Sequence, residues 1–190
     1  MRKSFGAKTI AYPAPVFIVG SYDENGKANA MNAAWGGICS SNPPCISVSL
    51  RAQRKTYDNI MDKKAFTINL PSEEYIAEAD YFGMVSGRDI DKFEKTGLTP
   101  VKSELVDAPY IDEFPVAIEC RLHKVVEIGV HIQLIGEIVD VKIRQECLDE
   151  NGQPDIDKIN PVLFTPEIRH YLKFGAKVAD AFSAGKKFIE

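Results

Sequence analysis

The feature of this sequence that most constrains its fold is a long β-hairpin, predicted in the second half of the chain. Apolar and polar residues alternate through residues 116–128, and after Gly129 a second such stretch returns through residues 131–143. Alternation of this kind is typical of strands that bury one face. On the outgoing strand, one face is expected to carry Val116, Ile118, Cys120, Leu122, Val126 and Ile128. On the returning strand the phase of the apolar residues changes, so we expect a β-bulge near Ile138.

Shorter strands are predicted before this hairpin. Residues 15–22 are apolar at nearly every position, and a turn rich in Asn and Gly leads into a hairpin partner at residues 28–35. Residues 45–50 and 65–70 alternate between apolar and polar positions, which indicates two further strands. A short helix is expected between them, over residues 56–62.

Further helices are expected after these strands and at the end of the chain. One covers residues 72–85 with Ser72 as its N-cap, and a smaller one covers residues 89–95 and stops at Gly97. Residues 166–187 are loosely amphipathic and are expected to be helical. Short strands, one long hairpin and inserted helices together predict a mainly β protein built on a closed or nearly closed antiparallel barrel. A parallel α/β sheet is disfavoured, because its strands and helices would alternate regularly.

Length and composition indicate one globular domain. The 190 residues fit a single core, so we expect one domain over residues 1–190. The net charge of −4 and a pI of about 5.5 argue against a general basic surface for nucleic acid. No run approaches the roughly 20 apolar residues of a membrane span, and the start of the chain lacks the apolar core of a signal peptide. A cytoplasmic location is therefore expected.

The cysteines and histidines form no pattern typical of a metal or nucleophile site. The residues concerned are Cys39, Cys45, Cys120 and Cys147, with no C-x-x-C pair, and His123, His131 and His170, which share no ligand spacing with them. We therefore expect no metal site, and no catalytic side chain of the Ser-His-Asp or Cys-His kind. Cys39 has two interpretations, a buried free thiol or a redox thiol.

A candidate anion site follows the strand that ends near residue 50. Ser47, Ser49 and Arg51 alternate with core positions, so two hydroxyls and a guanidinium are expected on one face. The chain then turns into a helix whose first N–H groups, with Arg51, Lys55 and the Thr56 hydroxyl, would suit a phosphate monoester. The alternative is a solvated strand face followed by a capped helix with basic surface residues.

A second candidate segment begins at Asn29. It contains Asn29, Met31, Asn32, Ala33, Ala34 and Trp35 and ends in two glycines. The small side chains would let a flat group approach the backbone, and the two asparagines can donate and accept hydrogen bonds at the edge of a heteroaromatic ring. The alternative is a strand whose small residues pack under a neighbour, with Trp35 in the core.

A third candidate segment covers residues 84–93 and contains Ser86, Gly87 and Lys92. It lies where one helix ends and another begins, with Asp89 as the candidate N-cap. Taken alone, this segment is not specific for any ligand. No G-x-G-x-x-G or P-loop pattern is present, so no Rossmann or P-loop nucleotide site is expected.

Taken in order, these segments resemble the flavin-reductase-like, FMN-binding split-barrel family, and most closely its flavoredoxin branch. The resemblance extends over roughly residues 12–175. Its main pieces are NAMNAAWGG at residues 29–37, ISVSLR at 46–51, FTINLP at 66–71 and DKF at 91–93, with later matches at 119–120, 136–138 and 170–171. Each piece is short, and it is their order and spacing that carry the resemblance.

The resemblance implies a six-stranded antiparallel Greek-key split barrel with inserted and C-terminal helices, which dimerises and holds one FMN per subunit. It implies that residues 29–35 edge the isoalloxazine ring, with the backbone of Cys39 and Ser40 nearby. By the same likeness, Arg51, Lys55 and Thr56 would hold the phosphate, and Ser86, Gly87 and Lys92 would close over the ribityl chain or the ring.

Two activities are consistent with this resemblance. In the first, the protein is an oxidoreductase that passes electrons from NAD(P)H or a protein donor through bound FMN to an acceptor. In the second, it is a flavoredoxin-type electron carrier that holds FMN tightly and has no nicotinamide activity of its own. Two further alternatives are a related split barrel for pyridoxal phosphate, haem or a deazaflavin, and a barrel without a cofactor.

Overall fold

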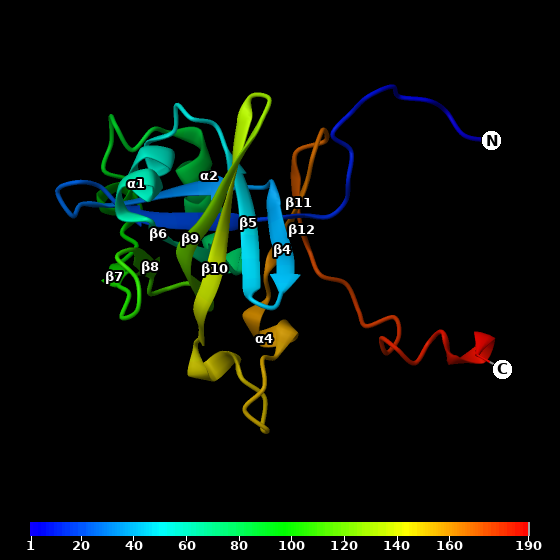
Figure 1. The fold of residues 1–190 in the computed structure, drawn as a ribbon. Helices are drawn as coiled ribbons and strands as arrows, with labels where there is room; N and C mark the ends of the chain where they lie inside the picture. Colours follow the sequence, from blue (N-terminus) through cyan, green and yellow to red (C-terminus); the bar gives the residue numbers. More distant parts are fainter. Residues whose placement is uncertain (190) are drawn as a thin grey trace.

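The structure, a computed structural model, describes residues 1–189 and consists mainly of antiparallel strands with a few short helices (Figure 1). The strands are β1 (Ala14–Pro15), β2 (Phe17–Tyr22), β3 (Ala28–Ala33), β4 (Gly36–Ser41), β5 (Pro44–Leu50), β6 (Ala65–Leu70), β7 (Pro100–Lys102), β8 (Pro109–Ile111), β9 (Val116–Ile128), β10 (His131–Ile143), β11 (Val162–Thr165) and β12 (His170–Lys173). The helices are α1 (Lys55–Lys63), α2 (Ile76–Met84), α3 (Lys92–Thr96) and α4 (Ile156–Ile159), with 3₁₀ turns η1 (Glu73–Tyr75), η2 (Gln145–Cys147) and η3 (Lys186–Phe188). Within residues 1–189, no helix is long and apolar enough to cross a membrane.

The main sheet closes on itself through one interrupted strand. Its seven strands are ordered β3-β2-β6-β9-β10-β5-β4, so β3 and β4 lie at opposite ends. Along the chain, however, only Ala34 and Trp35 separate them, and the backbone N–H of Ser49 in β5 donates to the Trp35 carbonyl at 2.7 Å. β3 and β4 therefore act as one strand that joins both ends of the sheet, in agreement with the six-stranded barrel expected. β5 and β6 are consecutive but not adjacent, as a Greek-key order requires.

The barrel encloses an apolar core formed by the inward residues of its strands. The predicted inward positions in β5 are confirmed, because Ile46, Val48 and Leu50 belong to the core and are each at most 2% exposed. Ser47 on the other face of the strand is also buried. Phe66 and Ile68 of β6 are fully buried opposite them. Burial of each such side chain stabilises the fold by about 1.5–3 kcal/mol. The same core contains Phe17, Val19, Ala33, Ile118, Cys120 and Leu134.

Two β-bulges interrupt the long hairpin of β9 and β10. One falls at Val139, next to Ile138, and confirms the bulge predicted there. The other falls at His123 in β9 and was not predicted. An extra residue moves every following side chain to the opposite face of the strand. For this reason Val125 packs against the core, in place of Val126 as the sequence had suggested.

The helices lie close to their predicted positions; Ser72 occupies an N-cap position, that of the 3₁₀ turn η1, and the N-cap predicted at Asp89 is wrong. The Ser72 side chain makes no capping hydrogen bond, because the 3₁₀ turn η1 precedes α2 and displaces its start. Asp91, and not Asp89, caps α3, since its carboxylate accepts hydrogen bonds from two backbone N–H groups at the start of that helix. Gly97 ends α3 with φ of 72°, as predicted.

The C-terminal segment does not form the helix predicted over residues 166–187. Its first part is strand β12, which pairs with β11, and the ring of Tyr171 packs against Phe164 at 5.7 Å between centroids. From Phe174 to Ile189 the side chains are exposed, so no packed face stabilises a helix there. Figure 1 shows both terminal segments extending away from the barrel on the side of β4, β11 and β12.

A second apolar cluster fills the space between the barrel wall and the helices α2 and α3. Ala79 and Phe82 of α2 and Phe93 of α3 pack on Ile18 and Ala30 of the barrel strands, all at most 6% exposed. The two phenylalanine rings meet edge to face, 5.5 Å between centroids. This packing fixes the end of α2 and the start of α3 beside β3.

Candidate functional site

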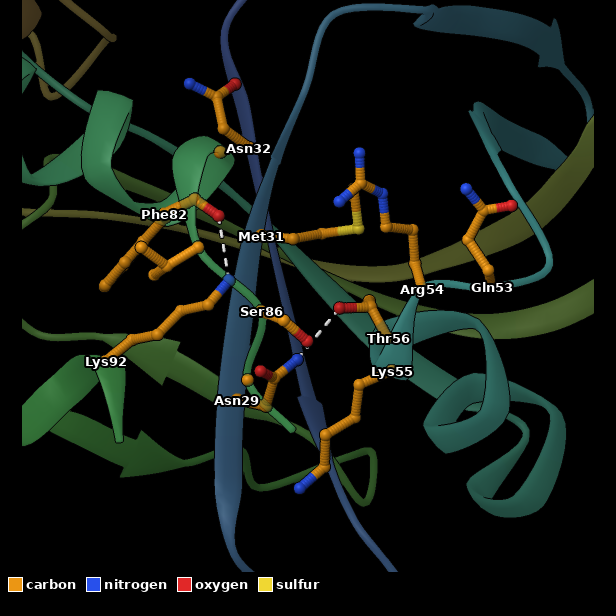
Figure 2. Close-up of a pocket in the computed structure, with 13 residues that line it drawn as sticks. Asn29, Met31, Asn32, Gln53, Arg54, Lys55, Thr56, Phe82, Ser86 and Lys92 are labelled. Carbon is orange, nitrogen blue, oxygen red and sulfur yellow. Dashed lines mark hydrogen bonds between the residues drawn. The ribbon is translucent and has the colours of Figure 1, made fainter. Parts of the chain in front are cut away.

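A pocket lies beside strand β3, between the start of helix α1 and the end of helix α2 (Figure 2). It is lined by Asn29, Met31, Asn32, Gln53, Arg54, Lys55, Thr56, Phe82, Gly83, Val85, Ser86, Gly87 and Lys92. All three candidate segments of the sequence therefore meet here. They contribute Asn29, Met31 and Asn32; Lys55 and Thr56; and Ser86, Gly87 and Lys92.

The N-terminus of α1 presents unpaired donors to this pocket. Arg54 occupies the N-cap position and its side chain makes no capping bond. Among the described residues, the backbone N–H groups of Lys55 and Thr56 have no acceptor, and the Arg54 guanidinium has no ion-pair partner. A helix N-terminus also carries partial positive charge from the helix dipole. This end of the pocket is therefore suited to an anion.

Thr56 and Asn29 form the buried polar floor of the pocket. The Asn29 side-chain amide donates to the Thr56 hydroxyl oxygen at 2.9 Å, and both residues are at most 5% exposed. The hydroxyl proton of Thr56 is thereby left available to a ligand. A Cβ atom added at Gly87 would overlap the Asn29 side-chain oxygen, so the backbone of this loop packs directly on Asn29.

Lys92 is a buried cation at the same pocket. Its ammonium donates to the backbone carbonyls of Ala30 and Phe82, each at 2.8 Å, and the residue is only 4% exposed. An ammonium has three donors, so one remains for a ligand. Burial, followed by the nearby charge of Arg54, lowers the pKa of Lys92 to about 8.

Lys55 is shared between the pocket and a carboxylate. Its ammonium pairs with Asp23 at 3.0 Å, and the two side chains are 20% and 13% exposed. Burial alone would raise the pKa of Asp23, but hydrogen bonds from the Lys27 backbone and from Lys55 outweigh it and hold that pKa below its ordinary value. Lys55 is therefore held in place, with donors still free for a ligand.

Six predicted site residues lie outside the pocket lining, namely Ala33, Ala34, Trp35, Cys39, Ser40 and Arg51. Ala33 faces the barrel core, and Trp35 is 37% exposed, so the alternative that placed Trp35 in the core is wrong. Arg51 is exposed, and the Ser47 hydroxyl that was expected beside it instead donates to the Gly37 carbonyl at 3.3 Å. Cys39 is exposed, so the interpretation as a buried thiol is wrong for this cysteine. A role for these six residues in cofactor binding stays a prediction.

Five lining residues were not predicted, namely Gln53, Arg54, Phe82, Gly83 and Val85. Arg54 could have been found, because it directly precedes the predicted helix start and supplies the cation that such a site needs. Phe82, Gly83 and Val85 come from the end of α2, which reaches β3 only through tertiary packing. Sequence periodicity contains no information on that contact.

A second hollow adjoins the pocket on the other side of Asn32. It is lined by Asn32, Ala34, Asp80, Gly83, Met84, Phe164, Arg169 and Tyr171. The Tyr171 hydroxyl donates to the Asp80 carboxylate at 2.7 Å and so ties β12 to α2. Burial, then that hydrogen bond, raises the pKa of Tyr171. The hollow combines aromatic surface with a cation, directly beside the pocket.

The donor set of the pocket suits a phosphorylated ligand. Three cationic side chains and one helix N-terminus border it, and none of its described lining residues is acidic. The volume of the pocket is about 70 Å³, below the roughly 300 Å³ of small ligand sites. The pocket formed by this chain is therefore smaller than a whole nucleotide requires.

Comparison with known proteins identifies the family to which this chain belongs. A family model described as "Flavin reductase like domain" matches residues 9–171. The chain is similar to flavoredoxin of Desulfovibrio vulgaris (Miyazaki F), with 53% identity, a TM-score of 0.94, and coverage of 97% of this chain and 100% of that one. It is also similar to flavoredoxin from Methanosarcina acetivorans, with 30% identity, a TM-score of 0.91 and 100% of both chains covered.

One curated relative, an uncharacterized protein of Aquifex aeolicus, is 30% identical over 159 residues, which are 80% of this chain and 81% of the relative. The family model thus spans the barrel and both walls of the pocket, and the two flavoredoxin structures share the fold over almost the whole chain. The chain belongs to the flavin reductase-like split-barrel family.

Proposed function

We propose that this protein binds one FMN and works as a flavoredoxin-type electron carrier. The observation that carries the proposal is the anion-binding pocket at the start of α1, in a chain more than half identical to a flavoredoxin. The sequence first favoured an NAD(P)H-linked oxidoreductase and kept the electron carrier as its alternative. The likeness to two flavoredoxins supports that alternative.

In this proposal the residues of the pocket bind and orient the cofactor. The N–H groups of Lys55 and Thr56, the Thr56 hydroxyl and the Arg54 guanidinium would hold the phosphate. Asn29 and Lys92 supply further donors from β3 and α3. When bound, the flavin supplies the electron-transfer chemistry, and positive charge beside it favours its reduction. No side-chain nucleophile or acid–base pair is required.

A second candidate function is reduction of flavin by NAD(P)H. It is favoured by the hollow beside Asn32, where Phe164, Arg169 and Tyr171 offer aromatic surface and a cation to a second ligand. A nicotinamide nucleotide combines a flat ring with phosphates, so this hollow matches its chemistry. The same hollow would equally admit part of the flavin itself.

We further propose that the protein is a cytoplasmic homodimer. Apolar side chains are exposed on one side of the barrel and along the C-terminal segment, among them Ile38, Ile168, Phe174 and Phe182. Exposed apolar groups of this size favour association with another surface.

An absorption spectrum of the purified protein, with and without added FMN, tests the central proposal. Flavin bands that stay with the protein on gel filtration, and that NADH and NADPH do not bleach without oxygen, are expected for the electron carrier. Bleaching by either nucleotide would instead establish the reductase. A colourless protein that leaves added FMN unbound would contradict both functions.

A further inference from the structure

The loop between α2 and α3 forms one wall of the pocket. Val85, Ser86 and Gly87 line the pocket from this loop, opposite the start of α1. Residues 85–91 form no regular secondary structure. Within the loop, the backbone N–H groups of Asp89 and Ile90 each donate to the Ser86 carbonyl at 3.2 Å. Its closed position therefore depends on contacts with other parts of the chain.

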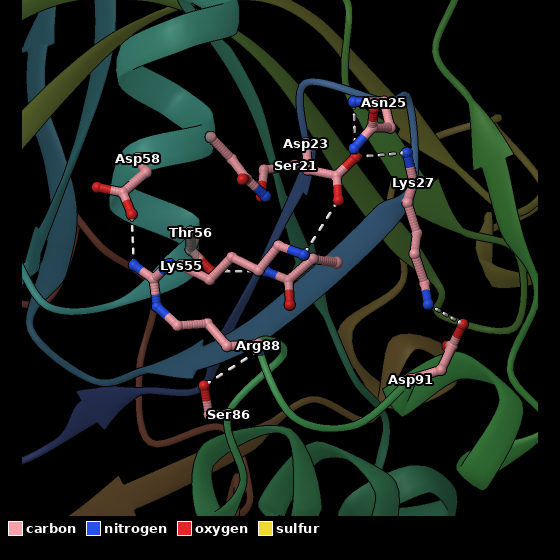
Figure 3. Close-up of polar contacts among 12 residues, drawn as sticks. Ser21, Asp23, Asn25, Lys27, Lys55, Thr56, Asp58, Ser86, Arg88 and Asp91 are labelled. Atoms are coloured by element: carbon pink, nitrogen blue, oxygen red, sulfur yellow. Dashed lines mark hydrogen bonds and ion pairs between the residues drawn. The ribbon is translucent and has the colours of Figure 1, made fainter.

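Two ion pairs fasten this loop to its surroundings, and Figure 3 shows both. Arg88 reaches across to helix α1 and pairs with Asp58. Asp91, at the other end of the loop, pairs with Lys27 of the β2–β3 turn at 3.0 Å. The Arg88–Asp58 pair joins the loop to the helix that borders the pocket, because Lys55 and Asp58 lie on the same helix.

The two ion pairs of the loop are more exposed to solvent than the Lys55–Asp23 pair. Arg88 and Asp58 are 50% and 54% exposed, and Lys27 and Asp91 are 56% and 29% exposed. Lys55 and Asp23, which lie below the loop, are far less exposed. Exposed ion pairs are weak and are screened by salt, whereas partly buried ones are screened much less. The two ion pairs that hold the loop are therefore weakened by salt more than the Lys55–Asp23 pair is.

We propose that the Arg88–Asp58 pair acts as a latch that sets how fast FMN leaves the pocket, while Asp91 holds the other end of the loop. This inference rests on the proposed function and refines it, since the latch decides whether the flavin is held or exchanged. Gly87 lies directly against the Asn29 side chain, so the loop packs on the buried polar floor that Asn29 forms with Thr56. Arg88 and Asp58 are positioning residues, because neither lines the pocket itself.

The rate of FMN release measures the latch directly. Release from the loaded protein is followed by the recovery of flavin fluorescence after rapid dilution, at low and high NaCl. Arg88→Gln and Asp58→Asn are each expected to speed release by about two- to fivefold at low salt, as for the loss of one exposed ion pair. The double variant should release no faster than either single one, because both remove the same contact.

Asp62→Asn is the matched control. Asp62 lies one turn further along α1, is exposed to the same degree as Asp58, and pairs with Lys63 and not with the loop. In the unchanged protein, NaCl should speed the release of FMN, because it screens the exposed ion pair. Asp62→Asn should show the same release rate and the same dependence on NaCl. Release rates of Arg88→Gln and Asp58→Asn that match Asp62→Asn would overturn the proposal.

Amide hydrogen exchange of residues 86–91 in the flavin-free protein gives a second readout. Exchange in Asp58→Asn should be about two- to fivefold faster than in Asp62→Asn, because the loop opens more often. A protein that binds no FMN would overturn the proposed function, and the latch would then be judged on this exchange alone. Unchanged exchange would overturn the latch as well.

Discussion

At the scale of single residues, the candidate site is built from polar groups that use only some of their hydrogen-bond donors within the protein. Lys92 donates to two backbone carbonyls and Thr56 accepts from Asn29, so each keeps one donor for a ligand. Burial brings the pKa of Lys92 to about 8, which places its charge change close to neutral pH. The charge of the pocket therefore depends on pH near 8.

Lys92→Met is expected to weaken FMN binding about tenfold at pH 7, which corresponds to about 1.4 kcal/mol. In the unchanged protein, affinity should fall as the pH rises through about 8, because a bound anion favours the protonated ammonium that the free protein loses there. The variant should lack this pH dependence. Fluorescence titration with FMN measures both, with Lys95→Met, an exposed lysine of the same helix, as control. Constant affinity in the unchanged protein from pH about 7 to about 10 would contradict the prediction.

Asp23→Asn is expected to lower the free energy of unfolding by about 1–2 kcal/mol at neutral pH, since charged hydrogen bonds to Lys55 and to the β2–β3 turn are lost. The pKa of Asp23 is lowered in the folded state, so its contribution is complete above pH about 4 and disappears as the pH falls through the folded pKa. Urea unfolding of both proteins should therefore differ at neutral pH and converge in acid. Glu24→Gln, at the exposed neighbouring position, should show no such difference.

At the scale of elements, strands were easier to predict than caps and tails. The strands β5, β6 and β9 were predicted from the alternation of apolar and polar residues, a property of adjacent residues. The burial of the polar face in β6 and in the first part of β9 was not predicted, because it depends on packing against other elements. The bulge at His123 could not be predicted, because it depends on pairing with β10. The helix predicted for residues 166–187 failed for the same reason, since pairing with β11 decides the structure of its first part.

Gly136 in β10 shows how one element depends on its neighbour. A Cβ added there would lie 2.5 Å from the Phe66 ring and 2.9 Å from the Cys120 side chain, inside the barrel core. Gly136→Ala is therefore expected to cost about 1–3 kcal/mol, the usual effect of overpacking. Chemical denaturation measures this cost. Gly37→Ala, in a strand where an added Cβ meets nothing within 4 Å, is the control and should change stability by less than about 0.5 kcal/mol.

At the scale of the whole molecule, the barrel and the pocket could be predicted from resemblance, but not how the site is assembled. Lys55 and Thr56 line the same pocket, because both lie at the start of one helix, and their role in binding an anion stays a prediction. Arg51 was grouped with them by spacing, and it is exposed and outside the pocket lining. The side walls come from α2 and α3, and only the three-dimensional packing brings them to β3.

Deletion of residues 175–190 tests the proposed dimer. The described part of this segment is exposed throughout, so its loss should leave the stability of the barrel within about 0.5 kcal/mol. Exposed Val178, Phe182 and Phe188 would bury their apolar surface only against another chain. Sedimentation equilibrium should show a dimer for the full chain and a dimer at least about tenfold weaker for the deletion, as for the loss of about 1.4 kcal/mol. A monomeric full chain would contradict the prediction.

The strand that closes the barrel has a consequence for the lifetime of the protein in the cell. β3 carries Asn29, Met31 and Asn32 at the pocket, and its continuation as β4 joins the ends of the sheet. Cofactor binding and closure of the barrel are thus linked equilibria that share one segment. At an FMN concentration one hundred times Kd, this linkage adds about 2.7 kcal/mol to the folded state. The melting temperature should therefore rise with the FMN concentration. When flavin is scarce, the protein should unfold more often and be degraded faster by proteases.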